Sequence, residues 1–352
     1  MQKKIYDVYN LLLRTFYRSL QQFLKTKIPI SQKLNFFLSS ISAFFKMKKS
    51  LGKPVLLTIE PTNTCDQKCP ICETGNGTLG REKRVMSYDS FKNIINQFDG
   101  TLNQLYFYFM GEPFLNKDAY KMIEYAENRG IYVSTCTNGN FVDPGNLINS
   151  KISEVNFQIS GMTQKLHTRY RVGGKLKQVL SKIEETVKIR DKHKAKTKIF
   201  VGYILMKHNE HQLNDFITFC KKAQVDNYNI IGTTARTVKQ AKEFMPSNSK
   251  YRIFSEKKLE KGLLVPKQRP NNYCGYLYGG TNIMVNGDVV SCCRDPKGKN
   301  VLGNVFDNNI YKIWNNEKYQ RVRTLVNKKS NSLDLCKICI GENVPELKEH
   351  KK

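Results

Sequence analysis

Short apolar runs alternate with amphipathic segments through the middle of the chain. The runs that predict strands are VLLTI (55–59), QLYFYF (104–109), IYVSTC (131–136), EVNFQI (154–159), KIFVGYILM (198–206) and YNII (228–231). Between them, apolar residues recur at helical spacing over 88–98, 117–130, 144–149, 176–193 and 213–223. Strands that alternate with helices predict a parallel sheet with right-handed crossovers. The fold class is therefore α/β, with six units in an open doubly wound sheet or an incomplete barrel.

Residues of unusual chemistry follow four of these predicted strands. Cys65, Cys69 and Cys72 come after the first strand, MGEP (110–113) after the second, TNG (137–139) after the third and SG (160–161) after the fourth. In either parallel architecture, ligands collect at the carboxyl ends of the strands. We therefore expect these four segments to meet at one rim of the sheet and to form a site.

The rest of the chain has a different character. Residues 1–50 hold ten Lys or Arg and one acid, Asp7, and their apolar positions recur at helical spacing. We predict a basic amphipathic helical extension over 1–53, which contacts an anionic membrane surface or packs on the main domain as a helical hairpin. The α/β part covers 54–232, the Lys-rich segment 233–270 is predicted to be a linker, and 271–352 is predicted to be a small cysteine-rich module.

The formal net charge of +28 allows nucleic acid, an anionic membrane or an acidic substrate as a partner. Basic residues occur throughout the chain, so charge alone does not choose among these. The first residues lack the form of a secretory signal, and no apolar stretch is long enough to predict a transmembrane helix. We expect a cytoplasmic protein, in which clusters among the ten cysteines bind metal or act in catalysis.

The stretch EPTNTCDQKCPIC (60–72) places three cysteines within eight residues. Thiolates suit zinc, copper(I) and iron–sulfur clusters. A structural zinc site takes four ligands, and a 4Fe–4S cluster is usually held by four thiolates. Three local thiolates would leave one iron of a cluster open to another ligand. A zinc site would need a fourth residue such as Cys136, which we expect instead to lie in the core.

This C-x3-C-x2-C spacing after a first strand, with MGEP and TNG after the next two, resembles the radical S-adenosylmethionine enzymes over residues 55–231. The resemblance implies a partial (β/α)6 TIM-type barrel and a 4Fe–4S cluster held by Cys65, Cys69 and Cys72. It also implies that S-adenosylmethionine chelates the open iron. One electron, from a donor such as flavodoxin or ferredoxin, then releases a 5′-deoxyadenosyl radical that abstracts hydrogen from the substrate.

The same resemblance assigns contacts to S-adenosylmethionine. Glu112 would receive the methionine amino group, Arg171 would meet the carboxylate, and Ile71 would lie beside the adenine. Met110 replaces the family's first glycine, and QISG (158–161) departs from the family's Ser-x-Asp-Gly. The full set of implied contacts is Ile71, Gly111, Glu112, Asn138, Gln158, Ser160 and Arg171. The structural alternatives are that Glu112 caps the following turn, Asn138 serves a turn and Arg171 forms a surface ion pair.

The cysteines near the end of the chain show a second pattern. Cys274 is followed after twelve residues by Gly287 and after four more by Cys292, which resembles the opening of the SPASM extension. The resemblance implies one auxiliary 4Fe–4S cluster, with spacing favouring Cys292 over Cys293 as a ligand. The implied ligands are Cys274, Cys292, Cys336 and Cys339. A four-cysteine zinc ribbon is the alternative.

These resemblances imply a radical enzyme in which a saturated auxiliary cluster relays an electron, so that the net reaction is an oxidation. Peptide-modifying relatives often carry a fused peptide-binding domain, whereas only about fifty residues precede the first predicted strand here. We therefore expect a small-molecule, sugar or lipid-linked substrate rather than a peptide. The alternatives are a peptide-modifying maturase or epimerase, and a zinc-stapled protein that binds nucleic acid. The last of these leaves the four rim segments unexplained, and we do not favour it.

Overall fold

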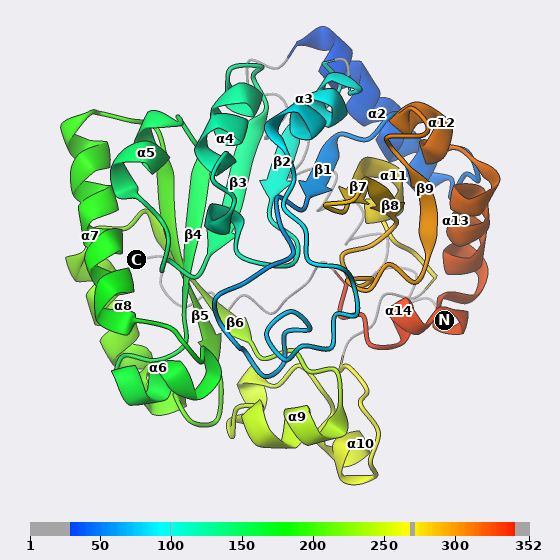
Figure 1. The fold of residues 1–352 in the computed structure, drawn as a ribbon. Helices are drawn as coiled ribbons and strands as arrows, with labels where there is room; N and C mark the ends of the chain where they lie inside the picture. Colours follow the sequence, from blue (N-terminus) through cyan, green and yellow to red (C-terminus); the bar gives the residue numbers. More distant parts are fainter. Residues whose placement is uncertain (1–28, 99, 268–271, 342–352) are drawn as a thin grey trace.

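The computed structural model describes residues 29–98, 100–267 and 272–341 (Figure 1). Within these residues one sheet has the strand order β6-β5-β4-β3-β2-β1-β7-β8-β9. Each of β1 to β6 runs parallel to its neighbours, and the sheet stays open at β6. These six strands are β1 Leu56–Ile59, β2 Gln104–Phe107, β3 Tyr132–Thr137, β4 Glu154–Ile159, β5 Lys198–Leu205 and β6 Asn227–Gly232. All six predicted strands are therefore present.

Helices connect these strands in the predicted order. They are α3 Tyr88–Asn96, α4 Ala119–Glu127, α5 Pro144–Asn149, α6 Gln164–Tyr170, α7 Leu176–Lys192 and α8 Leu213–Lys222. The short helix α6 was not predicted, because its seven residues show no clear apolar periodicity. Single 3-10 turns lie at Pro113–Leu115, Glu210–Gln212, Ser249–Tyr251 and Ser330–Ser332.

The two faces of the parallel sheet are covered differently. Leu57, Phe107 and Phe157 are fully buried in one core, and α3, α4, α5, α7 and α8 all contribute side chains to that core. The alternate positions on the opposite face are mostly polar, as at Asn156 and Gln158. A doubly wound sheet would carry helices on both faces. The one-sided cover therefore confirms the partial barrel, whose polar inner face is free of these helices.

The C-terminal module continues the same sheet. Strand β7 (Gly280–Ile283) pairs in parallel with β1, and β8 (Asp288–Val290) and β9 (Val301–Asn304) follow it in antiparallel order. Gly287 makes the predicted turn between β7 and β8 with φ 85°, and a Cβ atom there would lie 2.4 Å from Phe306. The helices of this module are α11 Tyr276–Gly279, α12 Ile310–Trp314, α13 Glu317–Lys329 and α14 Asp334–Lys337.

The segment 233–270, which was expected to be a linker, is folded where it is described. It contains α9 (Val238–Phe244) and α10 (Glu256–Glu260), with a small core that includes Ala241, Phe254 and Leu259. Helices this short carry too few apolar positions among their lysines to show a period. The segment packs below the rim in Figure 1 and reaches the cysteine loop.

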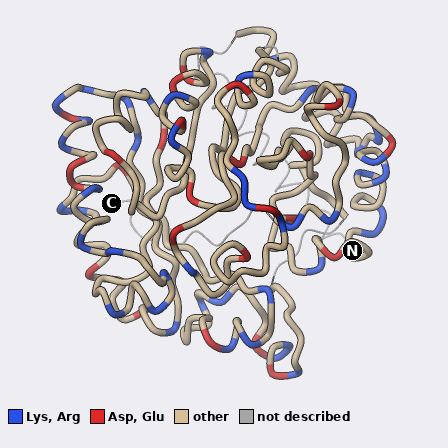
Figure 2. The backbone as a smooth tube through the Cα atoms, viewed as in Figure 1, with Lys and Arg blue, Asp and Glu red and all other residues tan. Residues whose placement is uncertain are grey.

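Part of the predicted N-terminal extension is a helix, α2 (Ile30–Phe44), and residues 1–28 lie outside the described residues. Among the helices that are described, none combines the length and the apolarity needed to cross a bilayer. Figure 2 shows Lys and Arg distributed over every part of the described backbone. The high net charge is therefore not gathered into a single basic surface in this view.

Glu60 fixes the end of β1. Its carboxylate is fully buried and accepts hydrogen bonds from Arg81 Nη1 at 2.8 Å and Arg81 Nη2 at 2.6 Å. The same carboxylate accepts from the backbone N–H of Val285 at 3.0 Å, just beyond β7. One buried ion pair thus joins the loop after the cysteines to the C-terminal module.

We predict that Arg81→Met lowers the free energy of unfolding by about 3 kcal/mol, because it leaves a buried carboxylate without its cation. Arg84→Met is the matched control. Its partner Glu82 is solvent-exposed, so the loss should stay below about 0.5 kcal/mol. Urea unfolding followed by circular dichroism measures both. Equal losses in the two variants would contradict the structural role of the Glu60–Arg81 pair.

Candidate functional site

The four segments that follow the first four strands meet at one rim, as their order in the sheet requires. The loop after β1 presents Cys65, whose sulfur accepts the N–H of Gln67 at 3.4 Å. The side-chain amide of Asn138, after β3, reaches the same sulfur at 3.8 Å. The loops after β1 and β3 are therefore in direct contact at the first cysteine.

The other two cysteines of the loop lie against an apolar wall. Cys69 and Ile71 are buried with Tyr170, Met206 and Phe244, and Cys72 packs at the edge of this cluster. Burial raises the pKa of the Cys65 thiol to about 12. Burial also raises the pKa of Cys69, and the Arg171 guanidinium lowers it in part. These thiols stay protonated at neutral pH unless a metal replaces the proton.

Gly111 and Glu112 join the second strand to the cysteine loop. Gly111 has φ 83°, and a Cβ atom there would lie 2.4 Å from the Thr62 carbonyl oxygen. The N–H of Glu112 donates to the Thr64 carbonyl at 2.8 Å. Only glycine permits this close approach of the two backbones, so MGEP is held directly beside the first cysteine.

The Glu112 carboxylate is almost wholly buried and accepts three hydrogen bonds. The donors are Thr137 Oγ1 at 2.7 Å, the Asn138 N–H at 2.8 Å and the Phe114 N–H at 3.3 Å. The bond from Phe114 caps the 3-10 turn Pro113–Leu115, so Glu112 does cap the following turn, as the structural alternative suggested. This role does not prevent the carboxylate from binding a ligand. Burial raises the pKa of Glu112 to about 7 despite these donors. A ligand ammonium beside the carboxylate would favour its charged form.

Asp66 and Asn140 belong to the same cluster, although neither was a predicted site residue. Asp66 accepts from Asn138 Nδ2 at 2.8 Å and from Asn140 Nδ2 at 2.5 Å. These bonds tie the residue after Cys65 to the end of β3. The one sequence signal was the amide-rich run TNGN, which is typical of side chains that bond to backbone and carboxylate groups.

Arg171 is buried, with its Nε donating to Ser160 Oγ at 3.0 Å. Because the side chain is buried, it is not placed for the surface ion pair suggested as an alternative. His167 accepts the Ser160 N–H through Nδ1 at 3.4 Å, and burial lowers its pKa to about 3. His167 is thus a neutral structural residue, while the Arg171 guanidinium lies close enough to Cys69 to affect its pKa.

Gln158 stands apart from this cluster. Its amide donates to Asn156 Oδ1 at 2.8 Å and lies over Gly202, where an added Cβ would approach it to 2.3 Å. The side chain therefore lies across the inner face of β4 and β5. No hydrogen bond described for it reaches Ser160 or Arg171.

Residues of 233–270 cover the cysteine loop from outside. Arg236 Nε donates to Glu73 Oε1 at 2.8 Å, and Gln240 in α9 donates to the Pro70 carbonyl at 3.1 Å. Both contacts bridge more than 150 positions of sequence. The segment expected to be a linker therefore holds the loop that carries Cys69 and Cys72.

The C-terminal cysteines form a second group. Cys274 and Cys336 pack against the same apolar cluster, which includes Tyr278. The pKa of Cys292 is raised by its hydrogen bond with Cys293 and by burial, with smaller effects of the neighbouring Cys293 and Cys274 thiols. Burial likewise raises the pKa of Cys336 to about 11, and the nearby Cys339 adds to the shift. Cys292 therefore lies near Cys274, and Cys339 near Cys336, while no three metal-ligating side chains of the described residues are arranged to hold a single metal ion.

Cys292 and Cys293 have different surroundings, and the hydrogen bond between the two thiols lowers the pKa of Cys293 to about 6 while it raises the pKa of Cys292. Cys292 Sγ accepts the N–H of Arg294 at 3.3 Å, and Cys339 Sγ accepts the N–H of Gly341 at 3.3 Å. Cys65 makes the same bond to the residue two positions later. Such donors suit a thiolate sulfur, because a charged acceptor strengthens the bond. The exposed Cys293 lies near Tyr108 of the inner face, and the pKa of Tyr108 is raised by burial, by Cys136 and Tyr106 and, to a smaller extent, by this thiol.

The side-chain chemistry of both groups suits iron–sulfur clusters. Each supplies buried or half-buried thiols, and in each at least one sulfur is already supported by a backbone N–H. Thiolates whose sulfurs accept backbone N–H hydrogen bonds are the ordinary ligands of these clusters. The first group offers three sulfurs, with Glu112 and Arg171 beside them, and the second offers four.

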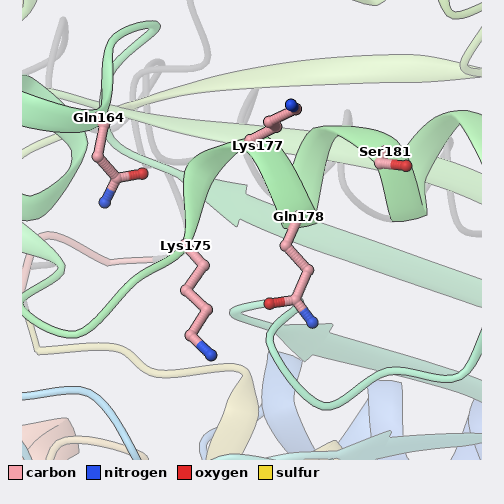
Figure 3. Close-up of a pocket in the computed structure, with 5 residues that line it drawn as sticks. All are labelled: Gln164, Lys175, Lys177, Gln178 and Ser181. Atoms are coloured by element: carbon pink, nitrogen blue, oxygen red, sulfur yellow. The ribbon is translucent and has the colours of Figure 1, made fainter.

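A separate pocket of about 470 Å³ lies on α6 and α7 (Figure 3). It is lined by Gln164, Lys175, Lys177, Gln178 and Ser181. None of the predicted site residues is among these five. Gln164 is engaged in holding the chain at Gly174 and Leu176, so we interpret this pocket as a feature of the helix junction.

Comparison with known proteins identifies two family matches. Residues 59–220 match the model of the radical SAM superfamily, and residues 274–340 match that of SPASM, an iron–sulfur cluster-binding domain. Together these two matches span more than half of the chain. They coincide with the two cysteine groups described above.

The individual relatives share only about a quarter of their residues with this chain over the aligned part. The chain is 25% identical over 176 residues to the mycofactocin maturase MftC of Mycobacterium ulcerans, and 24% identical over 173 residues to the PqqA peptide cyclase of Bradyrhizobium diazoefficiens. These alignments cover 49% and 48% of this chain, and 45% and 44% of the relatives. The chain thus spans about half the length of these curated relatives. Streptococcus suis SuiB, solved with S-adenosylmethionine, shares the fold with a TM-score of 0.62 at 17% identity, covering 95% of this chain and 84% of SuiB.

The relatives correct one expectation from the sequence. A small-molecule, sugar or lipid-linked substrate was expected in preference to a peptide, because few residues precede the first strand. The PqqA peptide cyclase acts on a peptide by its name, and SuiB has been solved bound to its precursor peptide SuiA. That expectation is therefore wrong. The number of residues before β1 therefore does not indicate the substrate class.

We predict that Cys292→Ala lowers the iron content of the anaerobically reconstituted protein from about eight to about four per chain, because one auxiliary cluster is lost. Cys293→Ala, the matched control at the next position, should keep about eight. Iron and acid-labile sulfide per chain measure both, and circular dichroism checks that each variant is folded. The reverse pattern would show that Cys293 is the ligand.

Proposed function

Because the chain belongs to the radical S-adenosylmethionine superfamily and carries a SPASM domain, we propose that it modifies a peptide by abstracting hydrogen from it. The family uses 4Fe–4S clusters and S-adenosylmethionine. When bound, these groups supply the electron that cleaves S-adenosylmethionine, the 5′-deoxyadenosyl radical that takes hydrogen and an acceptor for the electron left on the substrate. The observation that carries the proposal is the meeting of three cysteines, Glu112 and Arg171 at one rim.

We assign the first cluster to Cys65, Cys69 and Cys72. The Gln67 N–H supports the Cys65 sulfur, and the Asn138 amide approaches it. The apolar wall around Cys69 and Ile71 excludes water from this side of the site. Lower water access strengthens every electrostatic interaction between the chain and a charged ligand.

S-adenosylmethionine presents one ammonium and one carboxylate, and the rim offers a partner for each. The Glu112 carboxylate accepts three hydrogen bonds, so it has room for one more donor. The Arg171 guanidinium uses Nε on Ser160, and its remaining N–H groups can bind a carboxylate. Ile71 offers apolar contact to the adenine. The remaining contacts we propose are Gly111, Asn138, Gln158 and Ser160.

The auxiliary cluster is assigned to four thiols, which leave no open iron. The residues are Cys274, Cys292, Cys336 and Cys339. A saturated cluster cannot bind the substrate without losing a ligand, so transfer of an electron is its best role. The overall reaction would then be an oxidation of the substrate.

The inner face of the sheet suits a peptide. Tyr106, Tyr108 and Gln158 are half-buried there, beside Asn156. Every peptide unit carries one donor and one acceptor that must be matched when it leaves water. Phenol and amide side chains can supply both kinds of partner. This polar lining and the two curated relatives support a peptide substrate.

A deuterium-transfer experiment tests the substrate class. The reconstituted enzyme, S-adenosylmethionine and dithionite are incubated with the low-molecular-weight fraction of cells grown in deuterated medium. Deuterium in the 5′-deoxyadenosine reports abstraction from a substrate in that fraction. Prior digestion of the fraction with a mixture of peptidases should remove the deuterium signal. A signal that survives digestion would exclude a peptide, while leaving radical chemistry intact.

Replacing Cys65, Cys69 and Cys72 together by alanine is expected to abolish 5′-deoxyadenosine formation, because no thiolates remain to hold the first cluster. The C-terminal cluster should persist, with about four irons per chain. Liquid chromatography of the reaction mixture and iron analysis measure the two effects. Formation of 5′-deoxyadenosine by this variant would overturn the assignment of the site.

The affinity for S-adenosylmethionine should depend on pH through Glu112. Because the pKa of Glu112 is raised to about 7, its neutral form grows as the pH falls below that value and no longer attracts the ligand ammonium. Between about pH 7 and pH 5 the dissociation constant should rise, by up to about tenfold per pH unit. Equilibrium dialysis of the reconstituted protein with labelled ligand measures this slope.

Two variants test whether Glu112 is the group that causes the pH dependence of binding. Glu112→Gln should bind weakly at every pH and show no slope. Glu154→Gln changes a carboxylate at the other end of the inner face, where Ser134 and Tyr132 bind it, and should keep the slope of the native protein. A slope that survives in Glu112→Gln would assign the pH dependence to a different group.

A further inference from the structure

The helix α2 buries its polar side chains and exposes its apolar ones. Asn35 accepts the Lys53 N–H at 2.7 Å and donates to the Lys53 carbonyl at 3.2 Å. Ser39 also donates to the Lys53 carbonyl, and Ser42 accepts the Leu51 N–H at 2.8 Å. The hydrogen-bonding face of α2 is therefore turned toward the protein, which is the reverse of an ordinary surface helix.

The outer face of α2 is an apolar stripe. Of eleven large apolar side chains that are exposed among the described residues, six fall between residues 30 and 51. They are Ile30, Leu34, Phe37, Phe44, Phe45 and Leu51, and Phe44 and Phe45 are 58% and 69% exposed. The first four share one face of the helix by their spacing. Such a concentration on one element marks an interaction surface.

The surface is rigidly attached to the domain. Arg323, which is fully buried, donates to the Lys48 carbonyl at 3.3 Å, and Asn327 donates to the Lys46 carbonyl at 3.2 Å. Trp314 Nε1 donates to the Gly52 carbonyl at 2.9 Å. The turn after α2 is thus anchored to α12 and α13, so its exposed side chains are presented in a fixed arrangement.

The charges next to the stripe along the chain have one sign. Lys46, Lys48 and Lys49 are exposed directly after Phe44 and Phe45. The sequence contains no Asp or Glu between Asp7 and Glu60. A protein partner is usually matched by charges of both signs, whereas a basic border around an apolar face suits an anionic bilayer. Lysine side chains can keep their ammonium groups at the lipid headgroups while the rings lie deeper.

We propose that the exposed face of α2, with the lysines that follow it, docks the protein on an anionic lipid membrane. This inference does not depend on the reaction proposed above. The polar side chains of α2 bind Lys53 and Leu102, which precede β1 and β2, so α2 lies near the amino ends of these strands, away from the rim that carries Cys65 (Figure 1). The end of α2 also packs on the C-terminal module, where Ala43 is buried with Leu277 and Tyr278. Docking through α2 therefore leaves the rim open to a peptide from the aqueous side.

Co-sedimentation of the full-length reconstituted protein with vesicles tests the proposal. Vesicles of phosphatidylcholine with phosphatidylglycerol should bind the protein, and vesicles of phosphatidylcholine alone should bind it less. Phe37→Ser combined with Phe44→Ser should lower binding roughly tenfold, because two aromatic side chains no longer enter the interface. Added salt should weaken binding, because it screens the lysines.

The control combines Leu263→Ser with Phe306→Ser, which removes two comparably exposed side chains elsewhere, 52% and 49% exposed. It should bind vesicles as the native protein does. Iron content and thermal unfolding confirm that both double variants are folded. Equal binding by the α2 variant and the native protein would overturn the proposal and assign binding to another segment, such as residues 1–28.

Two other outcomes would also overturn the proposal. The first is no binding of the native protein to anionic vesicles. The second is a dimer in analytical ultracentrifugation that Phe37→Ser with Phe44→Ser dissociates, since a second copy would then cover the apolar stripe. All these measurements are independent of radical chemistry, so they distinguish failure of this proposal from failure of the proposed reaction.

Discussion

The parallel pairing of β1 with both β2 and β7 is the constraint on which the arrangement of the molecule depends. The pairing with β2 brings Glu112 beside Cys65, and the pairing with β7 starts the module that carries the later cysteines. Because both partners run in the direction of β1, their carboxyl ends reach the same rim. The buried Glu60 carboxylate holds this junction through Arg81 and the Val285 N–H. The two cysteine groups are thus positioned by one strand.

The division of the sheet into an apolar and a polar face follows from the alternation of side chains along each strand. One set of positions fills the core beneath the helices, as Leu57 and Phe157 do. The alternate positions point to the opposite face, which in the described part of the chain has no helices over it because the helices between the strands all pack on the apolar face. It is therefore free to carry Tyr108, Asn156 and Gln158. The same regularity that stabilises the domain leaves a polar surface that ends at the cysteine rim.

The sequence predicted the strands well because each is a short run rich in apolar and aromatic residues. EVNFQI corresponds to β4, whereas QLYFYF was two residues too long because strand pairing ends at Phe107. Cys65 and Glu112 were found from spacing and from their place after a strand. Asp66 was missed, because its partners Asn138 and Asn140 lie more than 70 positions away. Contacts set by tertiary structure leave no period in the sequence.

The polarity of α2 illustrates the same limit. A count of apolar residues in 30–44 indicates an amphipathic helix, and the ordinary expectation is that its apolar side packs on the protein. In α2 the polar side packs on the protein instead, because Lys53 and Leu102, which precede β1 and β2, present backbone groups to this helix. Asn35, Ser39 and Gln32 satisfy those groups, since buried backbone groups need hydrogen-bond partners. The apolar side is then left outside, where only an environment without water can cover it.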